Sequence, residues 1–194
     1  MRNNLFAVAG LSAALLLAQP ALAQQAASNA MMKSMQSGMS QMMNMKMTGD
    51  PDHDFASMMR MHHQGAVEMA DLELKQGKDA STKALASRIK AANQKEIKEM
   101  TQFLSTHKPM KSAMTKMGGN GMKAMHSGKH SMSGKADHDF ASMMVKHHQG
   151  AVDMSRAFLK EGKTATMKTL ANRIIREQTK EIAELKRLKA NPHQ

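Results

Sequence analysis

The chain has 194 residues, among them 24 Met and 10 His but no Cys, Trp or Tyr, and its formal net charge is +12. Without Cys, a disulfide framework and thiolate metal sites are excluded. Lys is spread along every segment and the aromatic residues are five Phe, so the chain lacks a stacking platform for single-stranded nucleic acid. We interpret the charge as solvation of the surface and expect no specific nucleic-acid partner.

Residues 1–23 have the pattern of a secretory signal peptide. A basic residue precedes a short apolar run, and an Ala-Leu-Ala cleavage site ends at Ala23. The run is shorter than the ~20 apolar residues that a membrane span needs. We therefore expect a periplasmic or secreted chain that starts at Gln24 and has no transmembrane segment after cleavage.

Residues 24–50 form a polar, Met-rich arm. Its Met residues recur mostly at steps of three and four, which is typical of one stripe of an amphipathic helix. The Met residues with this spacing are Met31, Met32, Met35, Met39, Met42, Met43 and Met45. Both metal capture by thioethers and binding to a partner remain open for this arm.

A block that begins at His53 returns at His138, an offset of 85 residues (138 − 53), without gaps and with more than half of its residues unchanged. The repeats span residues 51–107 and 137–192. Each predicts two helices joined by a loop of two or three residues, and so short a loop makes the helices antiparallel.

Gly and polar residues mark the loop of each hairpin. Gly77 is expected in the left-handed conformation that ends many helices, and Asp79 is expected to cap the next helix. Gly162 and Thr164 stand at the equivalent positions. Sustained period-two alternation is absent from the sequence, so we predict an all-α fold in which the two hairpins form an antiparallel four-helix bundle. Pairing of hairpins across two chains is the alternative.

The first helix of each repeat carries two adjacent His residues on an apolar stripe. On a helical wheel, His62 lies near the middle of the stripe and His63 at its edge. Met58 and Met59 precede His62 by four and three residues, which places thioethers beside the imidazole, and Met69 shares the stripe. The corresponding residues of the second repeat are Met143, Met144, His147, His148 and Met154.

These ten residues are candidate metal ligands, because imidazole and thioether groups bind soft metal ions. The competing interpretation is a core of adaptable Met side chains around hydrogen-bonded His. The second helix of each repeat adds Glu96 and Glu181 on its inward face. A buried carboxylate needs a partner, and we expect each to bond a His ring and turn its other nitrogen toward a metal.

A second set of candidate ligands lies outside this stripe. His53 and His138 begin the two blocks. Residues 108–136 form a linker with a flexible Gly-rich break. Its candidate ligands are Met122, Met125, His126 and His130. A flexible string of this kind suits weak, exchangeable metal capture and not a rigid catalytic centre.

The ligand types favour copper. Thioether sulfur binds Cu(I), and imidazole also accepts Cu(II) and Zn(II). Structural zinc sites rarely use Met, so zinc is the second choice. A di-iron bundle needs Glu three residues before His, and neither histidine pair has an acidic residue at that position.

The motif F-x-x-x-M-x-x-H-H-x-x-A-x-x-M, followed by a helix with Glu-Ile, resembles the motif of the bacterial family called domain of unknown function 305. It runs from Phe55 to Met69 with Glu96-Ile97, and from Phe140 to Met154 with Glu181-Ile182. The resemblance implies a ferritin-like four-helix bundle, export, and copper binding or tolerance. The family's Met four residues after the Glu is Met100 in the first repeat and Leu185 in the second, which implies two unequal sites.

The leading hypothesis is a copper-binding protein, not an enzyme, that buffers, sequesters or ferries copper in the periplasm. A periplasmic or membrane copper transporter is the expected partner. The alternatives are a ferritin-like metal-dependent oxidase and a Met-rich interaction module without metal.

Overall fold

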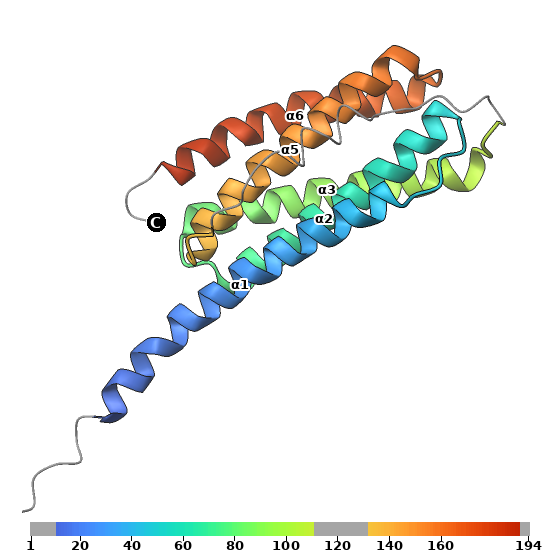
Figure 1. Cartoon of the computed structure of the whole chain (residues 1–194). Coiled ribbons are helices and arrows are strands. Elements are labelled where there is room, and N and C mark those ends of the chain that lie inside the picture. The colour runs from blue at the N-terminus through green and yellow to red at the C-terminus, as the bar shows by residue number, and fades with distance from the viewer. Residues whose placement is uncertain (1–10, 111–131, 191–194) are drawn as a thin grey trace, which may run out of the picture.

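The computed structural model describes residues 11–110 and 132–190, and of residues 11–20 the backbone alone (Figure 1). Most of the predicted linker and the start of the predicted signal peptide therefore lie outside the described residues. The helices are α1 (Leu11–Met43), α2 (Pro51–Gln76), α3 (Ala80–Thr106), α5 (Ala136–Glu161) and α6 (Ala165–Lys189). In the part of the chain that the structure describes there is no strand, and the predicted all-α class is confirmed.

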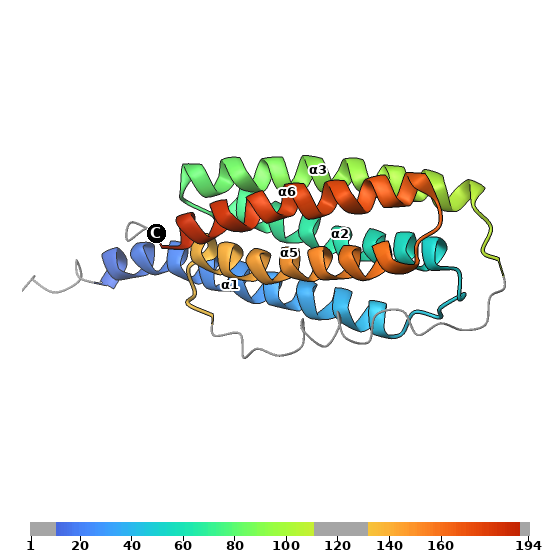
Figure 2. The ribbon, with the colours of Figure 1, turned by 90° about the horizontal axis from the view of Figure 1, so that it is seen from above.

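The five helices of the described ranges form three layers. Helices α2 and α3 make one hairpin, and α5 and α6 make the other. The hairpins meet along α2 and α5, while α3 and α6 lie together on one side and α1 packs along α2 and α5 on the other (Figure 2). The N-terminal part of α1 projects beyond the other helices (Figure 2). The hairpins of one chain thus bury their apolar faces on each other.

The glycine that ends the first helix of each hairpin is not left-handed, contrary to the sequence prediction. Gly77 has φ −63° and ψ 151°, and Gly162 has φ −59° and ψ 144°. Both positions are crowded: an added Cβ would lie 2.1 Å from Oε1 of Glu73 at Gly77 and 2.3 Å from the ring of Phe158 at Gly162. Glycine is needed there because a side chain one turn earlier folds beneath the loop.

The second helix of each hairpin begins at the residue that the sequence predicts. The Asp79 carboxylate accepts a hydrogen bond from the Thr82 backbone N–H at 2.7 Å. The Thr164 hydroxyl accepts one from the Met167 N–H at 3.4 Å. Each bond satisfies a backbone donor that the first turn of a helix leaves free.

Two aspartates bind the loop of the opposite hairpin. Asp52 of α2 accepts hydrogen bonds from the backbone N–H groups of Lys163 and Thr164, both at 2.9 Å. Asp137 of α5 accepts from Lys78 at 3.0 Å and Asp79 at 2.8 Å. Asp52 and Asp137 are equivalent in the two repeats, so the bonds relate the hairpins by an approximate two-fold. They fix the register in which α2 meets α5.

The core is rich in Met and falls into two clusters, one toward each end of the α2–α5 contact. Cluster one includes Met31, Met69, Met143, Met144 and Phe140. Cluster two includes Met58, Met59, Met100, Met154 and Phe158. The ring of Phe158 stacks on Phe55 with centroids 4.1 Å apart. Among the helices described, none has the length and apolar character needed to cross a membrane.

Candidate metal centre

The histidines in the middle of the two predicted stripes meet at the contact between the hairpins. The rings of His62 on α2 and His147 on α5 lie with their centroids 3.7 Å apart and their planes inclined by 36°. Both residues are buried, with exposed fractions of 1% and 4%. The sequence predicted two separate sites, and in the structure the central histidines of both lie side by side, because α2 and α5 meet at these residues.

Nitrogen atoms of this pair are buried without hydrogen-bond partners. Nδ1 and Nε2 of His62 and Nδ1 of His147 accept or donate no hydrogen bond to the described residues. Burial lowers the pKa of both rings well below the usual value, and the neighbouring imidazoles lower it further. Neutral imidazoles with free lone pairs are the form that coordinates a metal ion.

Clusters of Met side chains lie on both sides of the histidine pair, and each cluster contains Met residues from both repeats. Met58 and Met59, which precede His62, lie in cluster two with Met154 of the other hairpin. Met143 and Met144, which precede His147, lie in cluster one with Met69. All six of these side chains are at most 4% exposed. Antiparallel packing of α2 on α5 explains the mixing, since the start of one helix faces the end of the other.

The second histidine of each pair faces its own hairpin and not the partner hairpin. Consecutive helical residues point about 100° apart, so His62 and His63 face different neighbours. Nε2 of His63 is hydrogen-bonded to Oε2 of Glu96 at 2.7 Å. Nε2 of His148 lies 2.8 Å from Oε2 of Glu181 but is not aligned for a hydrogen bond. Both rings are fully buried, whereas the wheel placed them at the edge of the apolar stripe.

Glu96 holds His63 in a defined state. Burial alone would raise the pKa of Glu96, but the hydrogen bond with His63 and the contact with the Arg173 guanidinium outweigh it, and the pKa is lowered. The ionised carboxylate accepts a hydrogen bond from Nε2 of His63, and in the tautomer with the proton on Nε2 the lone pair is on Nδ1. That Nδ1 is buried and has no hydrogen-bond partner, and it can serve as a further donor.

Arg173 is a site residue that the sequence analysis missed. It reaches from α6 across to the other hairpin, where its Nε lies 3.2 Å from Oε1 of Glu96 and its Nη2 contacts Glu99. The equivalent Arg88 pairs with Glu184. The carboxylate of Glu96 is 6% exposed and that of Glu181 is 18% exposed. The two His–Glu pairs are therefore held unequally.

The other predicted ligands lie apart from this centre or outside the described residues. His53 and His138 are part-exposed, and their Nδ1 atoms lie 3.9 Å and 3.5 Å from the neighbouring Asp54 and Asp139. Met122, Met125, His126 and His130 fall outside the described residues. In the described ranges, no three or more His, Asp or Glu side chains are grouped as a metal site.

The donor set that the structure brings together fits a soft ion. It offers neutral imidazole nitrogens in a dry core, with thioethers on both sides. Imidazole and thioether ligands together suit Cu(I), and imidazole also accepts Cu(II). The unpartnered nitrogens are the observation that supports this fit, since buried polar atoms are otherwise nearly always hydrogen-bonded.

Comparison with known proteins agrees with the fold and with this chemistry. The model of the family described as "Domain of unknown function (DUF305)" matches residues 52–189. This chain belongs to that family. The match begins after α1, so α1 is outside the part that the family defines.

Solved structures of one protein, CopM, resemble the chain along most of its length. The Cu(II)-bound form is 32% identical, covers 71% of this chain and 95% of its own, and has a TM-score of 0.55. The Cu(I)-bound form is 31% identical, covers 70% of this chain and 93% of its own, and has a TM-score of 0.54. A silver-bound form obtained by co-crystallisation is 30% identical, covers 74% of this chain and 98% of its own, and has a TM-score of 0.57. No curated protein matches the chain.

Proposed function

We propose that this protein binds copper and buffers, sequesters or ferries it in the periplasm, without acting as an enzyme. The observation that carries the proposal is the buried His62–His147 pair, in which both nitrogens of His62 and Nδ1 of His147 lack hydrogen-bond partners. The pair lies between two clusters of thioethers. The copper- and silver-bound forms of CopM support it by similarity. Zinc is a weaker candidate, because thioethers flank the imidazoles.

The proposed ligand set follows from the geometry. His62 and His147 supply nitrogen, and the buried Met residues of the two apolar stripes supply sulfur. These are Met58, Met59, Met69, Met143, Met144 and Met154. His63 and His148 can add Nδ1, while Glu96 and Glu181 orient their rings. In the proposed assignment, metal binding by the arm and by the linker is secondary and exchangeable.

Further parts of the proposal concern the location of the protein, its partner, its fold class and its role. The signal-peptide pattern of residues 1–23 supports export. Export would place the protein where a copper transporter of the periplasm or membrane could exchange metal with it. The two hairpins support assignment to the ferritin-like four-helix class, with α1 as an added helix. A dry site lined by flexible thioethers suits storage and exchange better than catalysis, which needs rigidly held ligands and substrate access.

Metal analysis of the purified protein tests the proposal. After exposure to Cu(I), Cu(II) or Zn(II) and removal of free metal, we expect retained copper in excess of zinc. A His62→Gln/His147→Gln double variant should lose most of that copper, while a variant that replaces the part-exposed His53 and His138 by Gln should keep it. Equal copper retention by the two double variants would contradict the site, and no retention by the wild type would contradict the function.

A further inference from the structure

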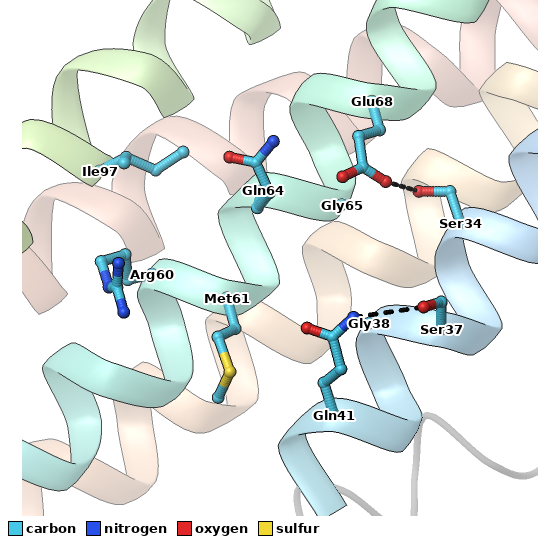
Figure 3. A pocket seen from close by; sticks show the side chains of 10 residues that line it. All are labelled: Ser34, Ser37, Gly38, Gln41, Arg60, Met61, Gln64, Gly65, Glu68 and Ile97. Carbon is cyan, nitrogen blue, oxygen red and sulfur yellow. Dashed lines mark hydrogen bonds between the residues drawn. The ribbon is translucent and has the colours of Figure 1, made fainter.

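A polar pocket of about 200 Å³ lies between α1 and α2, close to the histidine pair. Its α1 wall contains Ser34, Ser37, Gly38 and Gln41, and its α2 wall contains Arg60, Met61, Gln64, Gly65 and Glu68, with Ile97 of α3 at one side (Figure 3). Such a volume holds several water molecules. Because α1 precedes the residues that the family model matches, this pocket is a feature of this chain and not of the part that defines the family.

The pocket adjoins the histidine pair at one residue, Gly65. Gly65 lines the pocket, and a Cβ placed on it would lie 3.4 Å from Nε2 of His147. A glycine here removes the side chain that would otherwise stand between α2 and the imidazole. At Gly65 the pocket lining is therefore in contact distance of the His147 ring.

The lining of the pocket carries groups that can coordinate a soft cation transiently. The thioether of Met61 and the amide of Gln41 reach into the space between the helices (Figure 3). The Glu68 carboxylate accepts a hydrogen bond from the Ser34 hydroxyl at 2.6 Å and closes the pocket on that side. Arg60 also lines it, so charge alone does not select a cation. The sulfur of Met61 supplies the preference for a soft one.

The two repeats differ at this pocket. Arg60 and Met61 of the first repeat correspond to Val145 and Lys146 of the second (an offset of 85). Helix α1 covers the contact between α2 and α5 and forms the outer wall of the pocket on the α2 side only. The pocket, with the one thioether of Met61 in its lining, thus lies beside a pair of histidines to which both repeats contribute.

We propose that the α1–α2 pocket is the route by which a soft monovalent cation, Cu(I) or Ag(I), reaches the His62–His147 pair, with Met61 as a transient ligand and Gly65 as the passage. This inference rests on the proposed function and adds the path that the buried site requires. It assigns to α1 the role of an outer wall that keeps the passage narrow.

Loading kinetics of the full chain test the route. Cu(I) is supplied from a chromophoric chelator, and the loss of chelator absorbance is followed by stopped flow, together with the copper retained at equilibrium. We expect Gly65→Ala to slow loading by about tenfold, the effect of a small added barrier, without changing the copper retained. The matched control is Gly38→Ala, which adds the same methyl group to another helical glycine of the pocket, where the new Cβ meets nothing within 4 Å.

A second variant tests the role of sulfur. Met61→Leu keeps the volume and removes the thioether, so loading should slow while equilibrium copper stays the same. The control is Met43→Leu, because Met43 is an exposed Met of α1 outside the pocket lining. Unchanged loading rates in both Gly65→Ala and Met61→Leu would overturn the route and leave the proposed function standing. Reduced equilibrium copper in Gly65→Ala would place Gly65 in the site itself and also overturn the route. Absence of copper uptake by the wild type would overturn both proposals.

Discussion

Adjacent histidines on one helix have different environments, and the difference follows from helical geometry. His62 faces the opposite hairpin and meets His147, while His63 faces α3 and meets Glu96. A turn of about 100° between neighbours separates the two directions. His62 is left with unpartnered nitrogens, which can bind a metal ion. His63 is instead oriented by the Glu96 carboxylate.

The unequal support of the two His–Glu pairs gives a prediction. Glu96→Gln should destabilise the protein more than Glu181→Gln, since Glu96 contacts both His63 and Arg173 and is the less exposed carboxylate. Loss of charge-assisted bonds in a buried place costs on the order of 1–3 kcal/mol. Urea denaturation of the metal-free variants measures both free energies of unfolding. Equal losses, or a larger loss for Glu181→Gln, would contradict the asymmetry.

Glu73 is a buried carboxyl at a position where the second repeat has an apolar residue. It occupies the place of Phe158 beneath the hairpin loop, and its side chain is fully buried beside Asp137. Burial, and next the charge of Asp137, raise its pKa to about 9. The folded chain therefore keeps a proton on Glu73 at neutral pH that the unfolded chain releases.

This proton makes stability fall with rising pH. Between the unfolded pKa of Glu73, about 4.3, and its folded value of about 9, folding takes up a proton, so the free energy of unfolding drops by up to about 1.4 kcal/mol per pH unit. Glu73→Gln should remove this slope, so its free energy of unfolding should increase relative to that of the wild type as the pH rises from 5 to 9. Denaturation at several pH values measures this difference. The exposed Glu161→Gln is the control. Parallel pH profiles of wild type and Glu73→Gln would contradict the assignment.

At the scale of the elements, the hairpins are fastened at both ends by reciprocal aspartates. Asp52 and Asp137 each accept backbone N–H groups from the loop of the other hairpin. These bonds satisfy loop donors that the helices cannot, and they connect hairpins that are far apart in sequence. The position of the histidine pair depends on this register, because it sets which residues of α2 and α5 meet.

Removing one of these aspartates should loosen the docking of the hairpins. Asp52→Ala and Asp137→Ala are each expected to cost about 1–3 kcal/mol, the penalty for leaving buried backbone donors unpaired. Asp71→Ala is the control, because Asp71 makes a part-exposed pair with Lys90 and such pairs contribute about 0–1 kcal/mol. Thermal or urea unfolding followed by circular dichroism measures the losses. A cost of Asp52→Ala no greater than that of Asp71→Ala would show that the bond does not fasten the hairpins.

The helices and their starts could be read from the sequence, but the joining of the two repeats could not. Periodicity predicts which residues of one helix share a face, and it placed His62 and Glu96 inward correctly. It carries no information on which residues of two distant helices touch, so the contact of His62 with His147 and the reach of Arg173 to Glu96 were missed. Gly77 was assigned to a left-handed turn because sequence shows the glycine and not the Glu73 side chain that crowds it.

At the scale of the whole molecule, the duplication makes one shared centre in place of two. The approximate two-fold brings the equivalent His62 and His147 together at the meeting of α2 and α5, with a cluster of thioethers at each side. Helix α1 lies over this contact and adds a polar pocket on one side only. The internal symmetry therefore forms the core site, and the departures from it are the contact of Arg173 with Glu96, the buried Glu73 and the pocket.

The buried histidines predict loss of stability in acid. Burial and neighbouring imidazoles lower the pKa values of His62 and His147, whereas in the unfolded chain they titrate near 6.5. Below that pH the unfolded chain binds protons that the folded chain does not, so the free energy of unfolding falls as the pH drops, by up to about 1.4 kcal/mol per unit for each ring. Between pH 7 and 5, the His62→Gln/His147→Gln variant should lose less than the metal-free wild type. An equal loss would mean that these rings are protonated in the folded state.

The central claim is that His62 and His147 hold copper together with flanking thioethers, and X-ray absorption spectroscopy of the copper-loaded protein tests it most directly. For the wild type loaded with Cu(I), the account predicts nitrogen and sulfur scatterers in the first shell of the ion. In the His62→Gln/His147→Gln variant it predicts loss of the nitrogen scatterers together with most of the bound copper. A wild-type spectrum without sulfur, or a variant that keeps the same spectrum and the same copper, would contradict it.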